Sequence, residues 1–301
     1  MALEFRNVVE REMILIKGPE GWGEFSPFPG YGPEVTARWL AAALEAACQP
    51  LPDPVRTTVP VNVTVPAVDP QTAARLVTES GASTAKVKVA AGHDNEESEM
   101  ARLQAVSDAL GPGGRLRIDV NGAWSLDEAT RRLEALRVFD LEYVEQPVAA
   151  IADMVRLRAR VDVPVAADES VRTSTDPMEV VAAGGADLLV LKVQPLGGVW
   201  RTLDLAARSG LPVVISSALE SSVGLSHGVR AAASLPELPY ACGLGTAQLL
   251  GGDVTSRPLM AADGVISYRE IEPDELPKWR ADTSTAQGMM RRLRAAAELL
   301  T

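Results

Sequence analysis

The sequence predicts an α/β fold, a TIM-type barrel of parallel strands preceded by a small α+β capping domain. Short β-rich runs recur from residue 59 onward, stretches of helical period lie between them, and this rhythm stops after Leu250. Strands and helices in repeated alternation predict parallel strands joined by crossover connections. Eight such units match a closed barrel better than an open doubly wound sheet, which usually has fewer strands and a glycine-rich first turn.

The predicted capping domain comes first in the chain. Residues 1–55 begin with a charged, strand-like segment, continue through a loop rich in glycine and proline at 18–34, and include an alanine-rich helix at 37–49. We expect the part of this loop from Trp22 to Tyr31 to close over a ligand as a lid, since glycine-containing loops beside barrel mouths often do so. A rigid structural turn is the alternative.

The barrel is predicted to occupy residues 56–250, and a C-terminal segment residues 251–301. The predicted barrel strands are 59–65, 84–90, 115–122, 143–147, 164–170, 188–194, 212–217 and 240–245. Helical period predicts crossover helices at 97–110, 125–139 and 198–210. The C-terminal segment ends in a helical stretch at 285–300, which we expect to return and pack on the cap.

Composition restricts the classes of function. The chain has 301 residues, 47% of them hydrophobic, with a net charge of −11 and a pI near 4.8. Nucleic acids and anionic membrane surfaces repel an acidic protein that has no basic patch, so we expect neither as a partner. Cys48 and Cys242 lie far apart without a Cys/His cluster, which argues against a disulfide framework and a zinc site. The first residues lack the apolar run of a signal peptide, and we expect a cytoplasmic location.

Polar residues at the carboxyl ends of barrel strands are the main candidates for chemistry. Asp119, Glu145 and Asp168 end three consecutive predicted strands, so their carboxylates should meet at one rim of the barrel. Carboxylates brought together repel each other unless a cation neutralises them, and oxygen ligands suit Mg²⁺ or Mn²⁺. Each acid alone could instead cap a helix or pair with an arginine. The three together favour a divalent metal site.

Lysines from two further strands flank this predicted metal site. Lys86 and Lys88 share one face of their strand, because side chains alternate along a strand. Lys192 ends the predicted strand at 188–194, nearly opposite in the barrel. A lysine that acts as a base at neutral pH needs a pKa lowered by burial or by nearby cations, which a second lysine and a metal would supply. A single lysine often reaches solvent from a strand end, but that explanation fits two lysines in one apolar strand poorly.

Five motifs, in this order and spacing, resemble the enolase superfamily and within it the muconate-lactonizing subgroup. They are AKVKV at 85–89, RIDVNGAW at 117–124, YVEQPV at 143–148, ADES at 167–170 and LKVQPLGG at 191–198. Five motifs in register are far more specific than any one of them. The resemblance implies a modified TIM-type (β/α)7β barrel with a small N-terminal cap. It also implies chemistry that begins with removal of a proton α to a carboxylate, with a metal stabilising the resulting enediolate.

The resemblance further implies a role for each motif residue. Asp119, Glu145 and Asp168 would bind Mg²⁺, with Mn²⁺ as a possible substitute, Lys88 would be the acid/base, and Lys192 would be its partner across the site. Lys86 would support Lys88 electrostatically. Asn121 and Gln146 follow two of the metal ligands, where contacts to the ligands or to the substrate are expected.

Segments outside these motifs resemble one family more closely, the o-succinylbenzoate synthases. They are ISSALESSVGL at 215–225 and the shortened N-terminal domain, and the LKVQPLGG motif at 191–198 resembles the same family. The strand at 212–217 ends in Ser216 and Ser217, without the histidine of a mandelate-racemase arrangement, and His227 falls later in a helix. The last predicted strand lacks the Asp-x-Asp with which dipeptide epimerases hold an ammonium group.

This closer resemblance implies a small carboxylate substrate and a step of menaquinone biosynthesis. The substrate would be 2-succinyl-6-hydroxy-2,4-cyclohexadiene-1-carboxylate, which loses water so that its ring becomes aromatic. Lys88 would remove the α proton and return it to the hydroxide that leaves from the same face, a syn dehydration. Lys192 would stabilise the anionic intermediate. Ser217 could bond the succinyl group and Gly243 could let the substrate approach the backbone, although both have structural alternatives.

Two alternatives stay open. An N-acylamino-acid racemase of the same superfamily would use the same five residues, with Lys88 and Lys192 on opposite faces of the α carbon. A barrel that has lost catalysis and serves as a binding module is the other, although all the expected acids and lysines are present. The sequence does not predict an oligomeric state.

Overall fold

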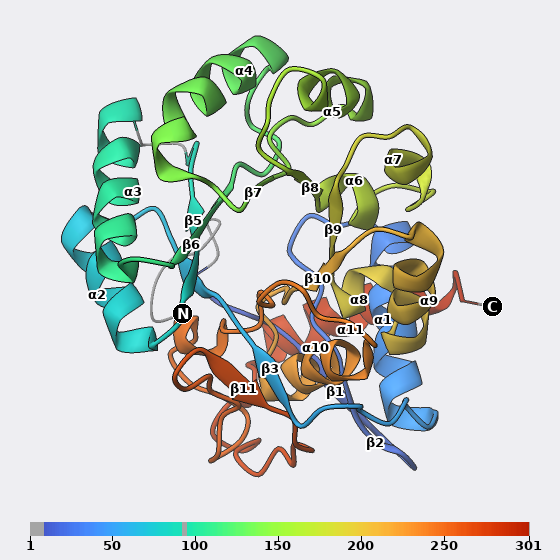
Figure 1. Cartoon of the computed structure of the whole chain (residues 1–301). Coiled ribbons are helices and arrows are strands. Elements are labelled where there is room, and N and C mark those ends of the chain that lie inside the picture. The colour runs from blue at the N-terminus through green and yellow to red at the C-terminus, as the bar shows by residue number, and fades with distance from the viewer. Residues whose placement is uncertain (1–8, 92–94, 301) are drawn as a thin grey trace.

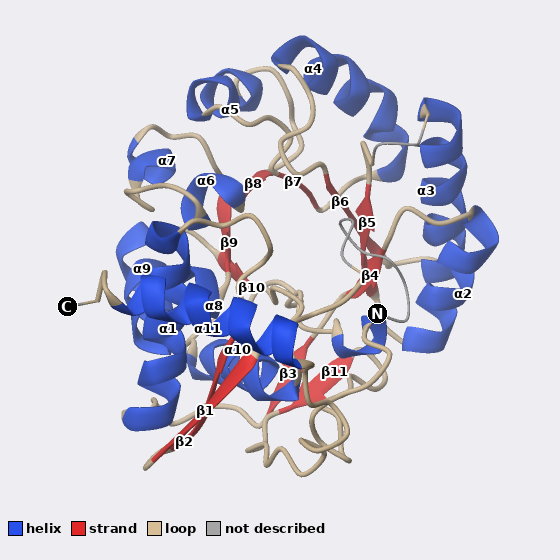
Figure 2. Ribbon diagram, turned by 180° about the vertical axis from the view of Figure 1, so that it is seen from behind, coloured by secondary structure: helices blue, strands red, loops and turns tan. Residues whose placement is uncertain are grey.

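The barrel predicted from residue 59 onward is present in the computed structural model, which describes residues 9–91 and 95–300. Strands β4 to β10 form one parallel sheet with the order β10-β9-β8-β7-β6-β5-β4. The sheet curves into a barrel wall, and helices α2 to α7 lie outside it (Figures 1 and 2). The first eight residues of the predicted strand-like start lie outside the described residues.

The elements follow the predicted alternation of strands and helices. The strands are β1 (Ile14–Gly18), β2 (Gly21–Phe25), β3 (Thr58–Pro60), β4 (Val63–Val65), β5 (Thr84–Lys88), β6 (Arg115–Asp119), β7 (Tyr143–Glu145), β8 (Val165–Ala167), β9 (Leu188–Leu191), β10 (Val213–Ile215) and β11 (Val265–Ser267). The α-helices are α1 (Pro33–Cys48), α2 (Pro70–Ser80), α3 (Glu96–Leu110), α4 (Leu126–Ala135), α5 (Ile151–Arg158), α6 (Glu169–Arg172), α7 (Glu179–Ala182), α8 (Val193–Leu196), α9 (Val199–Ser209), α10 (Ser222–Ser234) and α11 (Thr283–Ala297). Two 3-10 helices, η1 (Leu136–Phe139) and η2 (Ala247–Leu249), complete the described elements.

Polar residues begin several of these helices. Asp69, Asn95, Ser125 and Asp282 each accept a backbone N–H of the first turn with the side chain. Such caps satisfy N–H groups that have no partner inside the helix. They explain why these four helices begin at these residues.

The predicted strand at 240–245 is wrong as a regular strand, although this segment still closes the barrel. It makes two isolated parallel bridges, Val61 with Cys242 and Ser216 with Gly243. The N–H of Cys242 donates to Pro60 O at 2.7 Å on one side, and the N–H of Gly243 donates to Ile215 O at 2.9 Å on the other. Because the segment bonds first one neighbour and then the other, it forms no continuous ladder.

Several predicted strands extend beyond the observed ones at their carboxyl ends. Ala90, Asn121 and Gln146 have φ angles of 57°, 53° and 40°, which end the extended conformation. Strands β8 and β9 also end early, at Ala167 and Leu191. Asp168 and Lys192 follow them by one residue, whereas the sequence predicts that these two residues belong to the strands. The short helices α6 and α8 begin directly after these two residues.

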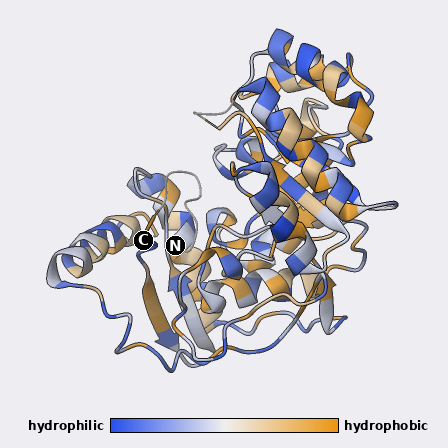
Figure 3. Cartoon of the chain, turned by 90° about the vertical axis from the view of Figure 1, so that its left-hand side faces the viewer, coloured by the Kyte–Doolittle hydropathy of each residue, from blue (hydrophilic) through white to orange (hydrophobic). Residues whose placement is uncertain are grey.

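Side-chain alternation divides the barrel residues into two sets. Outward residues of the strands pack with the helices in the largest core cluster, for example Ile118, Val144 and Leu189. Inward residues below the site form a smaller cluster of Tyr143, Ala166, Leu188, Val190 and Val214. Figure 3 shows helices that carry both polar and apolar residues, as expected for helices that cover a barrel on one side.

The cap is built from the β1–β2 hairpin and α1, and the C-terminal helix α11 packs against it. Phe25, Trp39 and Met289 share one buried apolar cluster that joins these three elements. The predicted loop from Trp22 to Tyr31 needs correction, because Trp22 pairs with Lys17 inside the hairpin and the loop starts after Phe25. The boundaries 1–55, 56–250 and 251–301 stay a prediction.

None of the described helices is long and apolar enough to cross a lipid bilayer.

Candidate active site

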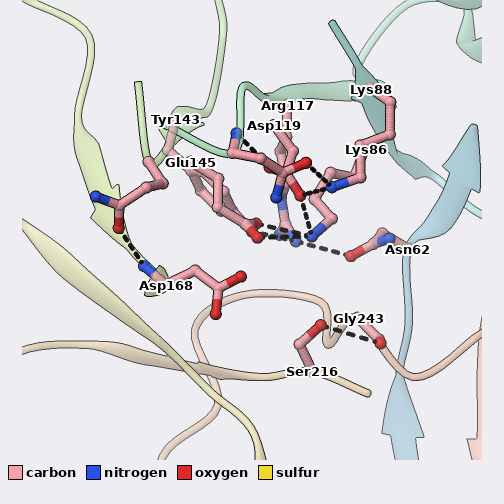
Figure 4. A network of polar contacts seen from close by, with 12 residues as sticks. Asn62, Lys86, Lys88, Arg117, Asp119, Tyr143, Glu145, Asp168, Ser216 and Gly243 are labelled. Carbon is pink, nitrogen blue, oxygen red and sulfur yellow. Dashed lines mark hydrogen bonds and ion pairs between the residues drawn. The ribbon is translucent and has the colours of Figure 1, made fainter. Parts of the chain in front are cut away.

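The barrel strands bring the three predicted acids into its interior. β6 and β7 pair in parallel with Asp119 opposite Glu145. Asp168 follows β8 and continues the inward row that Ala166 begins. Asp119 is 1% exposed, and Glu145 and Asp168 are fully buried. Figure 4 shows the three acids on neighbouring strands facing one interior space.

Two lysines from β5 contact these acids. Lys86 Nζ donates to both carboxylate oxygens of Glu145, at 2.9 and 2.8 Å, and to Asp119 Oδ2 at 3.2 Å. Lys88 Nζ contacts the same Oδ2 atom and donates to Asn121 Oδ1 at 2.7 Å. The terminal nitrogens of both lysines thus lie on one side of the carboxylates, as the alternation along β5 predicts (Figure 4).

These buried charges shift the pKa values of the groups in different directions. Burial raises the pKa of Asp119, but Lys88 and Lys86 lower it more, so it lies well below its ordinary value. Burial, together with the negative charge of Asp119, raises the pKa of Glu145 to about 7. Burial lowers the pKa of Lys86, yet Glu145 and Asp119 raise it above its ordinary value. Lys86 therefore stays protonated at neutral pH, which suits an electrostatic role better than that of a base.

Asp168 lies among cations on the other side of the site. Its Oδ2 accepts a hydrogen bond from Lys192 Nζ at 2.6 Å, and its Oδ1 accepts one from Arg172 Nε at 2.9 Å. Burial raises the pKa of Asp168, but Arg172 and Lys192 lower it more, so this pKa is also depressed. Lys192 and Lys88 therefore approach the acids from opposite parts of the barrel wall.

Gln146 and Asn121 hold neighbouring parts of the site in place. Gln146 is fully buried, and its Oε1 accepts the backbone N–H of Asp168 at 3.1 Å and that of Ser170 at 3.0 Å. Its Nε2 donates to Val148 O at 2.9 Å and to Ser170 Oγ at 2.7 Å. The Gln146 amide therefore positions Asp168, and its burial among protein groups argues against a direct contact with a substrate.

Asn121 joins the lysine side of the site to the arginine side. Its Oδ1 accepts from Lys88, and its Nδ2 donates to Glu169 Oε1 at 3.1 Å. Arg172 also bonds Glu169 Oε1. The positive φ of Asn121 is one that asparagine adopts more readily than most residues.

Ser216, Ser217 and Gly243 line one cavity together with Lys86, Lys88, Asp119 and Lys192. Ser216 Oγ donates to Gly243 O at 3.3 Å, and a Cβ on Gly243 would lie 2.5 Å from Ser216 Oγ. Close packing against Ser216 thus already explains the glycine. Ser217 Oγ bonds Thr246 Oγ1 at 2.5 Å and accepts the N–H of Leu219 at 3.1 Å.

The cavity has a volume of about 30 Å³. Sequence reasoning did not single out five lining residues, Phe28, Thr64, Ala218, Leu219 and Thr246, although Phe28 lies in the predicted lid loop. Thr64 pairs opposite Lys86, so the alternation along 59–65 could have found it. Phe28 enters from the cap, which strand patterns do not address.

The donor chemistry of the site fits a hard divalent cation, since three buried carboxylates from neighbouring strands offer oxygen atoms alone. In the described part of the chain, however, no three acidic, histidine or cysteine side chains converge as a set of metal ligands. The Lys86 ammonium contacts Asp119 and Glu145 instead, so cation binding requires Lys86 to move.

Comparisons with known proteins agree with this geometry. A family model described as enolase C-terminal domain-like matches residues 70–273, and one described as enolase N-terminal domain-like matches residues 1–47. The chain is 54% identical to an o-succinylbenzoate synthase of Thermobifida fusca, over 98% of this chain and 93% of the relative. It is 49% identical to an o-succinylbenzoate synthase of Mycolicibacterium smegmatis, over 91% of this chain and 85% of the relative.

A solved structure shares the fold. The dipeptide epimerase from Enterococcus faecalis, complexed with Mg and a dipeptide, superposes with a TM-score of 0.72 at 21% identity, over 87% of this chain and 90% of that one.

Proposed function

The chain belongs to the o-succinylbenzoate synthase family of the enolase superfamily, and from this we propose how its own residues carry out the family's dehydration. It is an enzyme, a hydro-lyase with a modified TIM barrel and an N-terminal cap. The proposed substrate is 2-succinyl-6-hydroxy-2,4-cyclohexadiene-1-carboxylate, and the proposed product is 2-succinylbenzoate. The contacts of Lys88 with Asp119 and of Lys192 with Asp168, beside the buried Glu145, carry this proposal.

Asp119, Glu145 and Asp168 are the proposed ligands of a divalent cation, Mg²⁺ in the first instance. When bound, the cation would supply positive charge for the substrate carboxylate and for the negative charge that develops next to it. Gln146 holds the backbone of Asp168, and Asn121 bonds Lys88, so both residues orient the groups that act.

Lys88 is the proposed base and acid. Its neutral amine takes the α proton as the C–H bond breaks, and the resulting ammonium returns that proton to the hydroxyl whose C–O bond breaks on the same face. Water leaves and the ring becomes aromatic, so atoms and charge balance without another reactant. Lys192, held by Asp168 on the other side, contributes positive charge against the anionic intermediate.

The test is conversion of the proposed substrate by the purified protein, followed by the absorbance of the aromatic product. We expect conversion with Mg²⁺, loss of conversion with EDTA, and recovery when excess Mg²⁺ is added. A protein that binds Mg²⁺ but leaves the substrate unchanged would contradict the proposal. Exchange of the α proton of an N-acylamino acid in D₂O would then support the racemase alternative, which no particular contact in the structure favours.

A further inference from the structure

The loop between β2 and α1, residues 26–32, carries an aromatic side chain into the active-site cavity. Phe28 lines this cavity together with Lys88 and Lys192. Its ring packs edge-on against Trp39, with centroids 5.9 Å apart, and against Tyr31, with centroids 6.1 Å apart. Phe28 thus forms an apolar wall that the cap adds to a cavity otherwise lined by barrel residues.

The backbone of this loop is held by two arginines from distant parts of the chain. Arg11 Nη2 donates to Ser26 O at 2.5 Å, and its Nε donates to Leu219 O at 3.0 Å, which joins the loop to the segment after β10. Arg292, on the C-terminal helix α11, donates from Nη1 to Pro27 O at 3.1 Å and from Nη2 to Phe28 O at 2.7 Å. Hydrogen bonds from a charged donor to a backbone carbonyl are stronger than neutral ones.

The two arginines contact different parts of the protein. Arg11 spans the cap and the barrel, and its guanidinium also lies 4.4 Å from the centroid of the Phe28 ring. Arg292 donates to the carbonyls of Pro27 and Phe28, which lie on either side of the Cα atom that carries the Phe28 side chain. Its helix is anchored to α1 through Met289 and Ala296 in the apolar cluster of the cap. Arg292 therefore fixes the Phe28 backbone relative to a rigid part of the cap.

We propose that Arg292 is a positioning residue for substrate binding, which acts by holding Phe28 as the apolar wall of the active site. This inference rests on the proposed function for its choice of substrate. A loop that samples several positions presents the binding-competent one only part of the time, and the apparent affinity falls by that fraction. Loss of the two hydrogen bonds should therefore raise KM, while the reacting groups of the barrel and kcat stay largely unchanged.

The kinetic test compares Arg292→Met with Arg291→Met. Methionine keeps an apolar stem but has no donors, and Arg291 is exposed on the same helix. We expect Arg292→Met to raise KM about tenfold, the effect of about 1.4 kcal/mol, with kcat within about twofold of the wild type. Arg291→Met should leave both constants unchanged. Equal KM values for the two variants would overturn the proposal.

A double-mutant cycle with Phe28→Ala tests whether Arg292 acts through Phe28. We expect Phe28→Ala to raise KM on its own, and the double variant to have a KM close to that of Phe28→Ala. Effects that multiply would show that Arg292 acts elsewhere. If Arg292→Met fails to fold, Arg292→Lys takes its place in the cycle, with a smaller rise in KM because a lysine can still donate to one of the carbonyls. A KM equal to that of the wild type in this variant would then overturn the proposal.

Hydrogen exchange separates this inference from the proposed function. Without any substrate, the amides of residues 26–32 should exchange faster in Arg292→Met than in Arg291→Met. Faster exchange in a protein that does not dehydrate the proposed substrate would leave the loop contact supported and the function contradicted. Unchanged exchange in an enzyme that dehydrates the proposed substrate would contradict the loop contact and leave the proposed function supported.

Discussion

At the scale of single residues, Lys88 and Lys86 illustrate how position decides the role of one residue type. Both lysines come from the same face of β5, yet Lys86 bonds two carboxylates and has a raised pKa, whereas Lys88 contacts only Asp119 of the three acids and also donates to Asn121. Both line the cavity. The residue farther along the strand is the one better placed for a substrate that enters from the carboxyl ends of the strands.

Replacement of Lys88 by methionine should abolish most of the activity. The variant lacks the group that moves the proton, so we expect kcat to fall by on the order of a thousandfold. Initial rates of dehydration measure this loss, and Lys278→Met, which changes an exposed lysine, is the control. Retention of a tenth of the wild-type kcat would rule out Lys88 as the base.

Replacement of Lys192 by methionine should be less damaging. Its proposed role is electrostatic, and removal of one such stabilising group costs about a hundredfold in kcat. The same rate assay measures this effect, and a variant with intact turnover would contradict the role. A loss as large as that of Lys88→Met would instead indicate that Lys192 transfers a proton itself.

Glu220 provides a prediction about stability and pH. Burial and the negative charge of Glu24 raise the pKa of Glu220 from 4.5 to about 7. The folded state therefore binds more protons than the unfolded state between these pH values. Its contribution to stability is complete below pH 4.5 and is lost as the pH rises through 7.

The variant Glu220→Gln removes this pH dependence. At 1.36 kcal/mol per pKa unit the loss amounts to about 3 kcal/mol. We expect Glu220→Gln to unfold at a higher denaturant concentration than the wild type at pH 8, and at about the same concentration at pH 5. The exposed Glu237→Gln serves as the control. A difference from the wild type that is the same at both pH values would show that the Glu220 charge is not responsible.

At the scale of elements, the cap depends on a close approach of α1 to the β1–β2 hairpin. A Cβ atom on Gly23 would lie 1.9 Å from Ala43 O, and one on Gly18 would lie 2.1 Å from Ala47 O. Both clashes are with the backbone of α1, which cannot rotate away as a side chain can. The two glycines therefore set the distance between the helix and the hairpin.

Gly23→Ala should destabilise the protein by about 3 kcal/mol, because overpacking at a backbone contact forces α1 away from β2. Denaturant unfolding measures the change. Gly32→Ala is the matched control, since Gly32 has a φ of −72° and a Cβ there would meet none of the described atoms within 4 Å. Equal stability of the two variants would show that the cap adapts to a wider spacing.

The barrel wall shows why element boundaries matter for the site. Strand β8 ends at Ala167 and β9 ends at Leu191, so Asp168 and Lys192 are the first residues after the hydrogen-bonded strands. Their side chains still follow the inward alternation of the strands. Side chains just past the strands can thus face the cavity while the backbone turns into helices α6 and α8.

At the scale of the whole molecule, charge balance is the property that a metal ion would change. The buried acids come from β6, β7 and the segment after β8, and the lysines come from β5 and the segment after β9. Binding of a divalent cation to the acids should stabilise the folded protein by mass action. The same cation should be required for turnover.

Thermal unfolding with and without Mg²⁺ tests this expectation. We expect the melting temperature to rise with Mg²⁺ concentration in the wild type and to rise less in Asp168→Asn, which loses one proposed ligand charge. EDTA should abolish activity, and excess Mg²⁺ should restore it. Full activity in EDTA would contradict a metal-dependent reaction.

The sequence by itself determined the fold class and the residues that gather at the site. Alternation along β5, β6 and β7 predicts which side chains face the interior, and the repeated order of strands and helices predicts a closed parallel sheet. The predicted acids and lysines are the ones that contact each other. These features are local or periodic, so the order of residues carries them.

Tertiary structure alone decided the features that join distant segments. Arg292 donates a hydrogen bond to Phe28 O, which is 264 residues away in the sequence, and Arg11 donates one to Leu219 O, which is 208 residues away. The irregular closure at 240–245 likewise depends on how separate segments meet. No local sequence pattern predicts such contacts, because they depend on how elements that are far apart in the sequence pack together.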